Sequence, residues 1–334
     1  MSSLRIGVIG TGFGARVVAP IFAATDGCEV TGIVSARDDG RVAALVARAD
    51  VDLVSIHSPP YLHAPHVRLA LEHGKAVLCD KPFAMSPAEA SELEAEADAA
   101  GVVHLVNFEF RYHPARQMLR DLVARGDLGR VEHVSWVHLS AGTRVPMRPF
   151  GWLFDRSLGG GWIGAWASHA VDTLRFCFGD VVAAVGFPRV DIAERPDRDG
   201  VMHTCTAEDG LTASLELERG ITVAIDSSYA ALGDIPPRLV VTGDEGVLEL
   251  VADERFTVTR GDGTREVSRV EATQGVDADR HHVAMHNWAT TVRDAVLGRE
   301  VPGDVPTFAD GRACDAVLAR LAGIGGSTDS DALG

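Results

Sequence analysis

The sequence is poor in cysteine, with five cysteines among 334 residues. They are odd in number, scattered and without a C-x-x-C pair: Cys28, Cys79, Cys177, Cys205 and Cys314. A disulfide framework needs an even, regularly spaced set, and a structural zinc site needs closely spaced pairs. The pattern therefore indicates reduced thiols in a reducing compartment and predicts no metal centre.

The sequence also lacks a long apolar run. Its first apolar segment, residues 4–9, is too short for a signal peptide and leads directly into a glycine turn. No stretch of the chain is long and apolar enough to cross a bilayer. We therefore expect a cytoplasmic protein that does not use a membrane as a partner.

Positive charge is scarce as well. The chain carries 31 basic and 47 acidic residues, which gives a formal net charge of −16. A surface this acidic repels a phosphate backbone and anionic membranes over most of its area. Nucleic acid is therefore not an expected partner, and a small molecule is.

A chain of this length is expected to divide into two domains. In its first third, short apolar strands alternate with helical segments. The strands are predicted at 4–9, 29–34, 52–57, 76–79 and 102–108, and the helices at 16–25, 39–49, 63–73 and 87–100. Such alternation predicts a parallel sheet with right-handed crossovers, which is an α/β dinucleotide-binding domain over residues 1–120.

The second part of the chain, residues 121–334, has a different pattern. Strand-like segments follow one another through short turns, at 131–139, 181–190, 201–207, 212–218, 222–229, 238–242, 247–251 and 255–259. Short turns favour antiparallel pairing. Two helices, 281–297 and 308–321, close the chain, and the second is expected to pack back on the body. The pattern predicts an α+β domain with an open, mostly antiparallel sheet.

The first turn has the spacing G-x-G-x-x-(G/A), formed by Gly10, Thr11, Gly12, Phe13, Gly14 and Ala15. It follows a strand and opens a helix, which is the context that a dinucleotide fingerprint requires. Gly10 permits the tight turn, Gly12 lets the backbone approach a pyrophosphate, and Ala15 keeps the helix close to the strand. Free N–H groups at the start of the helix then face the anion. The alternative is a plain strand–turn–helix connection.

The end of the second strand bears on the choice between NAD and NADP. An acidic residue at this point would bind the ribose 2′-hydroxyl. The chain has Ser35 and Arg37 instead, and both side chains suit a 2′-phosphate. We therefore favour NADP, while Asp38 and Asp39 leave NAD open and Arg37 is alternatively a solvated loop residue.

Several segments resemble the Gfo/Idh/MocA family of oxidoreductases. They are residues 54–63, 74–82, 107–114, 159–161 with 168–172, and 306–321, which follow in order over almost the whole chain. The resemblance implies a Rossmann domain joined to an open antiparallel sheet domain. It also implies a homo-oligomer, a dimer or tetramer that associates through that sheet, and hydride transfer on sugars, cyclitols or related alcohols and ketones.

Carried over residue by residue, Lys81 matches the lysine of the family's E-K-P motif, and His169 matches the histidine of its D-x-G-x-H motif. An imidazole can take the hydroxyl proton, and an ammonium group can stabilise charge on the reacting oxygen. The alternatives are a surface lysine and a core histidine. The resemblance also places further residues beside the cofactor, namely Ser58, Pro59, His63 and Asp80.

The chain departs from the family pattern in three ways. Asp80 replaces the usual glutamate, and Ala165 replaces the aspartate four residues before His169, with Ala167 at the motif glycine. We therefore predict that Asp172, one helical turn after His169, supports the histidine as a third catalytic residue. The alternative is that Asp172 pairs with Arg175.

The third departure is a short connection between the second strand and residue 52. One strand–helix step of the family pattern is missing there, so the adenine side of the sheet is expected to lack an edge strand.

Substrate contacts are expected from Lys81, His169, Asn107, Trp152 and Trp166. Asn107 follows the last predicted strand of the first domain, where the crevice opens, and a tryptophan can stack on a sugar face. The two tryptophans are alternatively packing residues. Arg111 is another candidate beside the crevice or, alternatively, a structural anchor between the domains. The spacing of His281, His282 and His286 allows a metal site, but no added carboxylate supports one.

The leading function is therefore NAD(P)-dependent transfer of a hydride to or from a secondary alcohol or ketone of a sugar- or cyclitol-like substrate. The first alternative is a non-catalytic sensor of dinucleotide and sugar, which the replacement by Ala165 keeps open. The second alternative is a reductase of a flat, non-sugar carbonyl compound, which the aromatic residues near Trp152 and Trp166 would suit.

Overall fold

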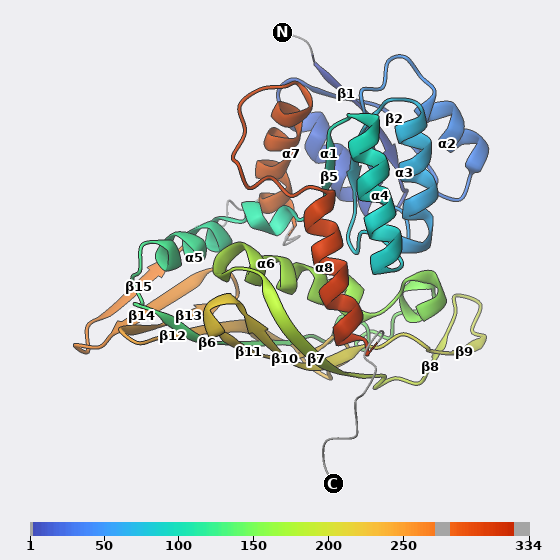
Figure 1. Ribbon diagram of the computed structural model, residues 1–334. Helices are drawn as coiled ribbons and strands as arrows, with labels where there is room; N and C mark the ends of the chain where they lie inside the picture. The colour runs from blue at the N-terminus through green and yellow to red at the C-terminus, as the bar shows by residue number, and fades with distance from the viewer. Residues whose placement is uncertain (1–2, 271–280, 324–334) are drawn as a thin grey trace.

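The computed structural model describes residues 3–270 and 281–323, and it contains two large sheets (Figure 1). The first sheet has five strands in the order β2-β1-β3-β4-β5, all paired in parallel. These strands are β1 (Leu4–Ile9), β2 (Cys28–Val34), β3 (Leu53–Ile56), β4 (Ala76–Cys79) and β5 (His104–Val106). The predicted Rossmann-type sheet is confirmed.

The helices between these strands explain the sheet order. They are α1 (Ala19–Ala24), α2 (Asp39–Val46), α3 (His63–Glu72) and α4 (Pro87–Ala100). After the short α2 the chain passes directly to β3, on the other side of β1, so β2 is an edge strand. This topology confirms the missing edge strand.

The first predicted helix begins in an unexpected way. A π-helical turn over Gly14–Val18 precedes α1, and Pro20 lies at the start of α1. A proline has no backbone N–H to donate, and the first residues of a helix need none, so the position tolerates it. The proline that interrupts the predicted helix therefore marks the junction between two helical forms.

The second sheet has eight strands in the order β15-β14-β13-β12-β6-β11-β10-β7. Its strands are β6 (Val131–Leu139), β7 (Val181–Arg189), β10 (Gly210–Leu217), β11 (Thr222–Ser228), β12 (Ile235–Gly243), β13 (Gly246–Val251), β14 (Arg255–Arg260) and β15 (Arg265–Arg269). All neighbours are antiparallel except β6 and β11, which run in parallel. The mostly antiparallel sheet is confirmed.

Three helices lie over one face of this sheet, between it and the first sheet (Figure 1). They are α5 (Pro114–Ala124), α6 (Ser168–Phe178) and α8 (Phe308–Leu321). One apolar core of residues from both sheets joins them. The predicted return of the last helix to the body is confirmed, because α8 packs against α4, α6 and β7.

Some elements differ from the prediction. The segment 201–207 forms only the short β9 (Met202–Thr204), which pairs with β8 (Glu194–Pro196) in a separate two-stranded sheet. Its last residues instead pack against the loop at Phe154, whose carbonyl accepts from the Thr206 and Ala207 amides. Helix α5 and strands β8 and β15 were not predicted. The two strands are short and polar and carry a weak periodic signal. Helix α5 buries Ala115, Leu119 and Leu122 at helical spacing, so its signal was present in the sequence and was missed.

The helix α7 (His282–Val296) joins the far end of the chain to its beginning. Its residues Met285 and Trp288 are fully buried against β1 and α1, where they contact the cluster of Leu4, Ile6 and Phe22. The parallel sheet is therefore completed by residues near the C-terminus of the chain.

Candidate active site

The glycine turn after β1 uses its three glycines differently. Gly10 has φ +131°, and a Cβ there would lie 2.4 Å from the carbonyl oxygen of His57. At Gly14 a Cβ would lie 2.9 Å from the Cβ of His57, whereas at Gly12 it would meet nothing within 4 Å. Close packing of helix on strand thus depends on Gly14 and not, as predicted, on half-buried Ala15. The exposed backbone at Thr11 and Gly12 leaves the space that a diphosphate needs.

Polar residues meet at the carboxyl ends of β3, β4 and β5. His57 Nδ1 lies 3.0 Å from Asp80 Oδ2, and the Asn107 amide donates to Asp80 Oδ1 at 2.7 Å. The other ring nitrogen of His57 lies 2.7 Å from Ser55 Oγ. Burial alone would raise the pKa of Asp80, but His57, Lys81 and Asn107 lower it, so the carboxylate is charged. Asp80, predicted beside the cofactor, therefore organises this edge of the sheet.

Lys81 extends from the end of β4 toward the second sheet. Its Nζ donates to the carbonyl oxygen of Ala165 at 2.7 Å. Ala165 lies in a second π-helical turn, Ile163–Ala167, which leads directly into α6. His169 follows four residues later, on the same side of the helix. The structure thus brings the lysine to within one helical turn of the histidine.

Around His169 the structure gathers residues that are far apart in the sequence. Glu109 Oε1 lies 2.7 Å from His281 Nδ1 and 3.8 Å from His169 Nε2. The ring of Phe110 packs against both imidazoles, at centroid distances of 4.6 Å to His169 and 5.1 Å to His281. Phe13 of the glycine turn packs edge-on against His281, at 5.1 Å. His281 therefore connects the surroundings of His169 with the predicted cofactor turn.

The predicted support of His169 by Asp172 is wrong. Both carboxylate oxygens of Asp172 accept from the guanidinium of Arg111, at 2.6 to 3.1 Å. Arg111 also donates to Asp310 of α8 at 2.7 Å, so it anchors the segment after β5 to α6 and α8, which fits the alternative of a structural anchor. The alternative partner, Arg175, donates to Asp180 at 2.8 Å and is not hydrogen-bonded to Asp172. Helical spacing identifies residues that can contact each other within α6. It does not reveal a partner from another segment, such as Arg111.

The predicted cofactor contact of His63 is also wrong, because the side chain is fully buried. Its ring nitrogens lie 2.9 Å from the Ser58 carbonyl oxygen and 3.0 Å from that of Pro82. Burial lowers the pKa of His63. The histidine joins the loop of Ser58 and Pro59 to the loop that follows Lys81. Ser58 uses its hydroxyl internally, 3.2 Å from His66 Nδ1.

At the end of β2, Ser35 Oγ accepts from the backbone amide of Arg37 at 3.4 Å. The Arg37 side chain is exposed. Asp38 is the N-cap of α2, and its carboxylate accepts from the Arg41 amide at 3.1 Å. Of the two acidic alternatives, Asp38 is therefore engaged in capping α2, whereas Asp39 is the exposed first residue of that helix.

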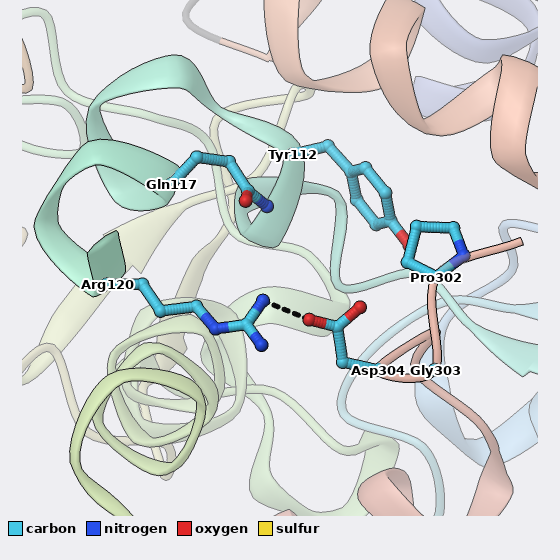
Figure 2. A pocket seen from close by; sticks show the side chains of 6 residues that line it. All are labelled: Tyr112, Gln117, Arg120, Pro302, Gly303 and Asp304. Carbon is cyan, nitrogen blue, oxygen red and sulfur yellow. Dashed lines mark hydrogen bonds and ion pairs between the residues drawn. The ribbon is translucent and has the colours of Figure 1, made fainter. Parts of the chain in front are cut away.

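A cavity of about 510 Å³ lies elsewhere, beside α5 (Figure 2). It is lined by Tyr112, Gln117, Arg120, Pro302, Gly303 and Asp304. Arg120 and Asp304 pair with each other across it. The cavity contains none of the predicted site residues, and its two charged groups neutralise each other.

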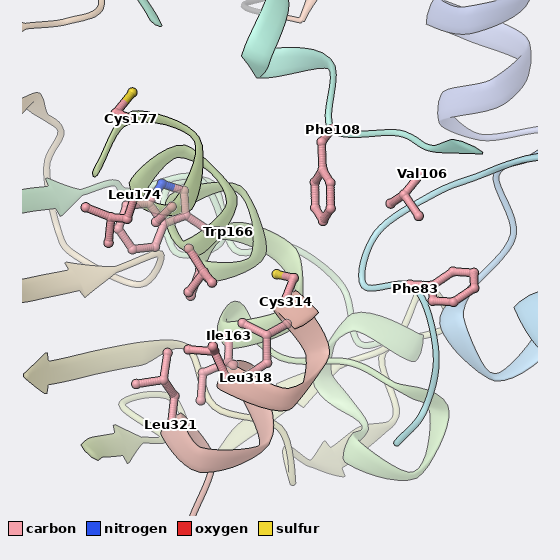
Figure 3. Close-up of a cluster of buried hydrophobic side chains, with 14 of the residues drawn as sticks. Phe83, Val106, Phe108, Ile163, Trp166, Leu174, Cys177, Cys314, Leu318 and Leu321 are labelled. Atoms are coloured by element: carbon pink, nitrogen blue, oxygen red, sulfur yellow. The ribbon is translucent and has the colours of Figure 1, made fainter. Parts of the chain in front are cut away.

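Trp166, predicted as a substrate contact, is 7% exposed and packs in the core (Figure 3). Its ring contacts Trp136, His138 and Trp162, on the side of the second sheet. The packing alternative is therefore correct for Trp166. Trp152 lies half-buried in a separate small cluster with Leu153 and Phe154.

Glu109 was not predicted as a site residue, and His281 was considered only as a metal ligand. Glutamate is rarely buried, and the sequence gives no sign that residues 109, 169 and 281 meet. Within the two described ranges, no group of three or more side chains is arranged to hold a metal ion. In the same ranges, no helix has the length and apolar character needed to span a membrane.

A parallel sheet with a glycine turn, facing a large antiparallel sheet across a lysine and a histidine, is the architecture of a dinucleotide-dependent oxidoreductase. A model of an oxidoreductase family with an NAD-binding Rossmann fold matches residues 4–108, and a model of the GFO/IDH/MocA C-terminal domain matches residues 116–249. The chain belongs to the GFO/IDH/MocA family, and it is an NAD(P)-dependent oxidoreductase.

Individual relatives of the chain are also oxidoreductases. An uncharacterized oxidoreductase of Synechocystis is 32% identical over 268 residues, which cover 75% of this chain and 72% of that protein. The D-apiose dehydrogenase of Paraburkholderia graminis is 31% identical over 283 residues, 77% of this chain and 70% of that one. A structure of levoglucosan dehydrogenase with NADH and L-sorbose matches with a TM-score of 0.83, at 21% identity, over 97% of this chain and 98% of that chain. It shows the same fold.

Proposed function

We propose that the chain interconverts a secondary alcohol and a ketone on a sugar- or cyclitol-like substrate. The observation that carries the proposal is the position of Lys81, which reaches from the nucleotide sheet to the helical turn that precedes His169. Relatives named D-apiose dehydrogenase, levoglucosan dehydrogenase and 1,5-anhydro-D-fructose reductase support the substrate class.

The glycine turn fits a dinucleotide, because Gly12 has open space where a side chain would stand. Backbone N–H groups from Thr11 to Ala15 would hold the diphosphate, since that of Gly10 donates to the Val34 carbonyl oxygen. When bound, the nicotinamide supplies the acceptor or donor of the hydride. Asn107 and Asp80 hold the ends of β4 and β5 next to this site.

In the direction of oxidation, His169 takes the proton of the substrate hydroxyl. Lys81 donates a hydrogen bond to the same oxygen and stabilises its developing negative charge. To do so, its ammonium group turns from the Ala165 carbonyl to the substrate or shares its three donors between them. Trp152 is left as a candidate for the rim of the substrate site.

For the cofactor, NADP is preferred over NAD. Exposed Arg37 and the Ser35 hydroxyl suit a 2′-phosphate, and the carboxylate of Asp38 caps α2. A relative from Haloferax volcanii is named D-xylose 1-dehydrogenase (NADP(+)) 2 and is 28% identical, although levoglucosan dehydrogenase was solved with NADH. Steady-state kinetics with both cofactors measure the preference.

We further propose a homo-oligomer that buries the face of the eight-stranded sheet opposite α5, α6 and α8. Large apolar side chains are exposed on this face, among them Val185, Phe187 and Val247. Analytical ultracentrifugation is expected to show a dimer or tetramer. A cytoplasmic location and a domain boundary near residue 120 remain predictions.

The activity is tested with a panel of sugars, cyclitols and flat carbonyl compounds, by following the absorbance of the reduced cofactor. Turnover of at least one sugar or cyclitol is expected, and it is expected to be lost in His169→Asn. Cofactor binding without turnover of any compound would favour the sensor, and turnover of only the flat compounds would favour the second alternative.

A further inference from the structure

The turn before α6 lacks the carboxylate that the family motif places four residues before the histidine. Ala165 has only a methyl group there, and its carbonyl oxygen accepts from Lys81. Asp172, the nearest carboxylate on α6 after His169, is held by Arg111. His169 therefore has no carboxylate from its own helix with a free oxygen.

Glu109 approaches His169 from another segment, the 3-10 turn Glu109–Tyr112 after β5. Its side chain is 1% exposed, and Oε1 lies between His281 Nδ1 at 2.7 Å and His169 Nε2 at 3.8 Å. Its second oxygen, Oε2, is buried and has no hydrogen-bond partner among the described residues. A buried carboxylate with one unsatisfied oxygen is costly unless a positive charge compensates it.

The compensating charge does not come from the neighbouring arginine. Arg111, two residues further along the chain, is bound to Asp172 and Asp310 and is already shared by two carboxylates. Lys81 extends to the Ala165 carbonyl on the turn before α6. His57 packs against the Phe13 ring at a centroid distance of 5.9 Å and is paired with Asp80. The imidazoles of His281 and His169 both lie close enough to Glu109 to compensate its charge.

We propose, building on the proposed function, that Glu109 is the positioning residue of His169 and replaces the carboxylate missing at position 165. His281 holds the carboxylate in place through its Nδ1–H. A nearby negative charge favours the protonated form of an imidazole, so Glu109 makes His169 a stronger base for the substrate proton. The ring of Phe110 packs against both imidazoles and so holds them in position beside Glu109.

The experiment compares Glu109→Gln with the wild type in the full-length protein. In alcohol oxidation we expect kcat to fall about 10- to 100-fold with KM changed less than about threefold, since substrate binding does not use Glu109. The acid limb of the pH profile is expected to move to lower pH by about one unit, because His169 loses the neighbouring charge. Glu109→Asp keeps the charge, so its kcat and the acid limb of its pH profile are expected to lie between those of the wild type and those of Glu109→Gln.

The decisive variant returns the carboxylate to the helix. In the double variant with Glu109→Gln and Ala165→Asp, kcat and the acid limb are expected to recover at least partly. A purely structural role of Glu109 would not be rescued from a position on another segment. Wild-type kcat and an unshifted profile in Glu109→Gln would overturn the proposal.

A second readout does not need a substrate. The pKa of His169, followed by NMR through its ring C–H signals and assigned with His169→Asn, is expected to be lower in Glu109→Gln than in the wild type. An unchanged pKa overturns the inference even if no substrate is found. Absence of turnover in the wild type, with the pKa shift present, would instead count against the proposed function alone.

Discussion

Two buried charge clusters lie next to each other where the segment after β5 meets α6, and they are built differently. In the arginine cluster, Arg111 is bound by both Asp172 and Asp310. In the histidine cluster, Glu109 has two imidazoles beside one oxygen and, in the part of the chain that the structure describes, no hydrogen-bond partner at the other. The first cluster is saturated with strong hydrogen bonds, and the second is not.

The difference indicates different tasks. A charged group whose hydrogen bonds are all made within the protein has no donor or acceptor available for a ligand. Arg111 is such a group, and it holds α6 and α8 in place. A buried group with remaining capacity, beside an imidazole and the cofactor turn, can respond when a proton arrives. Glu109 and Arg111 are two residues apart in the chain but differ in role. Arg111 stabilises the fold, whereas Glu109 is suited to respond to a proton.

The largest effect is expected in the saturated cluster. Asp172→Asn leaves the buried guanidinium of Arg111 short of one carboxylate, so the free energy of unfolding should fall by about 3–5 kcal/mol. Urea denaturation followed by circular dichroism measures this loss. Glu109→Gln, the matched variant, is expected to lose about 1 kcal/mol or less. Equal losses in the two variants would show that the clusters do not differ in kind.

The next effect concerns the two lysines of the chain, Lys75 and Lys81. Lys81→Met is expected to lower kcat about 10²- to 10³-fold, because a donor to the reacting oxygen is lost. Lys75 donates to the carbonyl oxygens of Arg48 and Val51, far from the site residues. Lys75→Met should therefore lower stability while keeping kcat near the wild-type value. Retained turnover in Lys81→Met would exclude the lysine from the chemistry.

A third buried carboxylate, Asp315 of α8, extends the comparison because no described cation or imidazole is paired with it. Its Oδ2 accepts from the Ala84 amide at 2.8 Å, and burial raises its pKa to about 8. The folded chain thus keeps a proton on Asp315 that the unfolded chain releases above about pH 4. This group's contribution to stability is therefore present at low pH and is lost as the pH rises toward 8.

Asp315→Asn removes this pH dependence and keeps an acceptor for Ala84. Relative to the wild type, its free energy of unfolding should rise between pH 5 and 8 by roughly 1–3 kcal/mol. Urea denaturation at several pH values measures the difference. A difference that stays constant with pH would mean that Asp315 is charged in the folded protein at neutral pH.

The smallest effect is expected at an exposed charge outside both clusters. Arg37→Ala is expected to raise the KM for NADPH about tenfold, because roughly one charge-assisted hydrogen bond to the 2′-phosphate is lost. The KM for NADH is expected to change less than about twofold. Arg41→Ala, which removes an exposed arginine of α2 nearby, serves as the control. Equal changes for both cofactors would mean that Arg37 does not contact a 2′-phosphate.

The fold was largely predictable because it depends on local periodicity. Alternating apolar runs predicted the parallel sheet, and strands joined by short turns predicted the antiparallel one. Parts of the site were predictable where a motif fixes the backbone, as at Gly10 and Lys81. The partners of buried charges were not, since Arg111 lies 61 residues from Asp172 and Glu109 lies 172 residues from His281. Nothing in local spacing encodes such pairs.

The packing of α7 on the first strand has a consequence for biosynthesis. Trp288 and Met285 cover apolar side chains of β1 and α1 that emerge from the ribosome hundreds of residues earlier. Until α7 is translated, the nascent parallel sheet exposes an apolar surface. Chaperones would have to shield this surface from aggregation. A fragment cut at the apparent boundary near residue 120 is therefore expected to aggregate on expression, unless a peptide spanning residues 281–297 is supplied in trans.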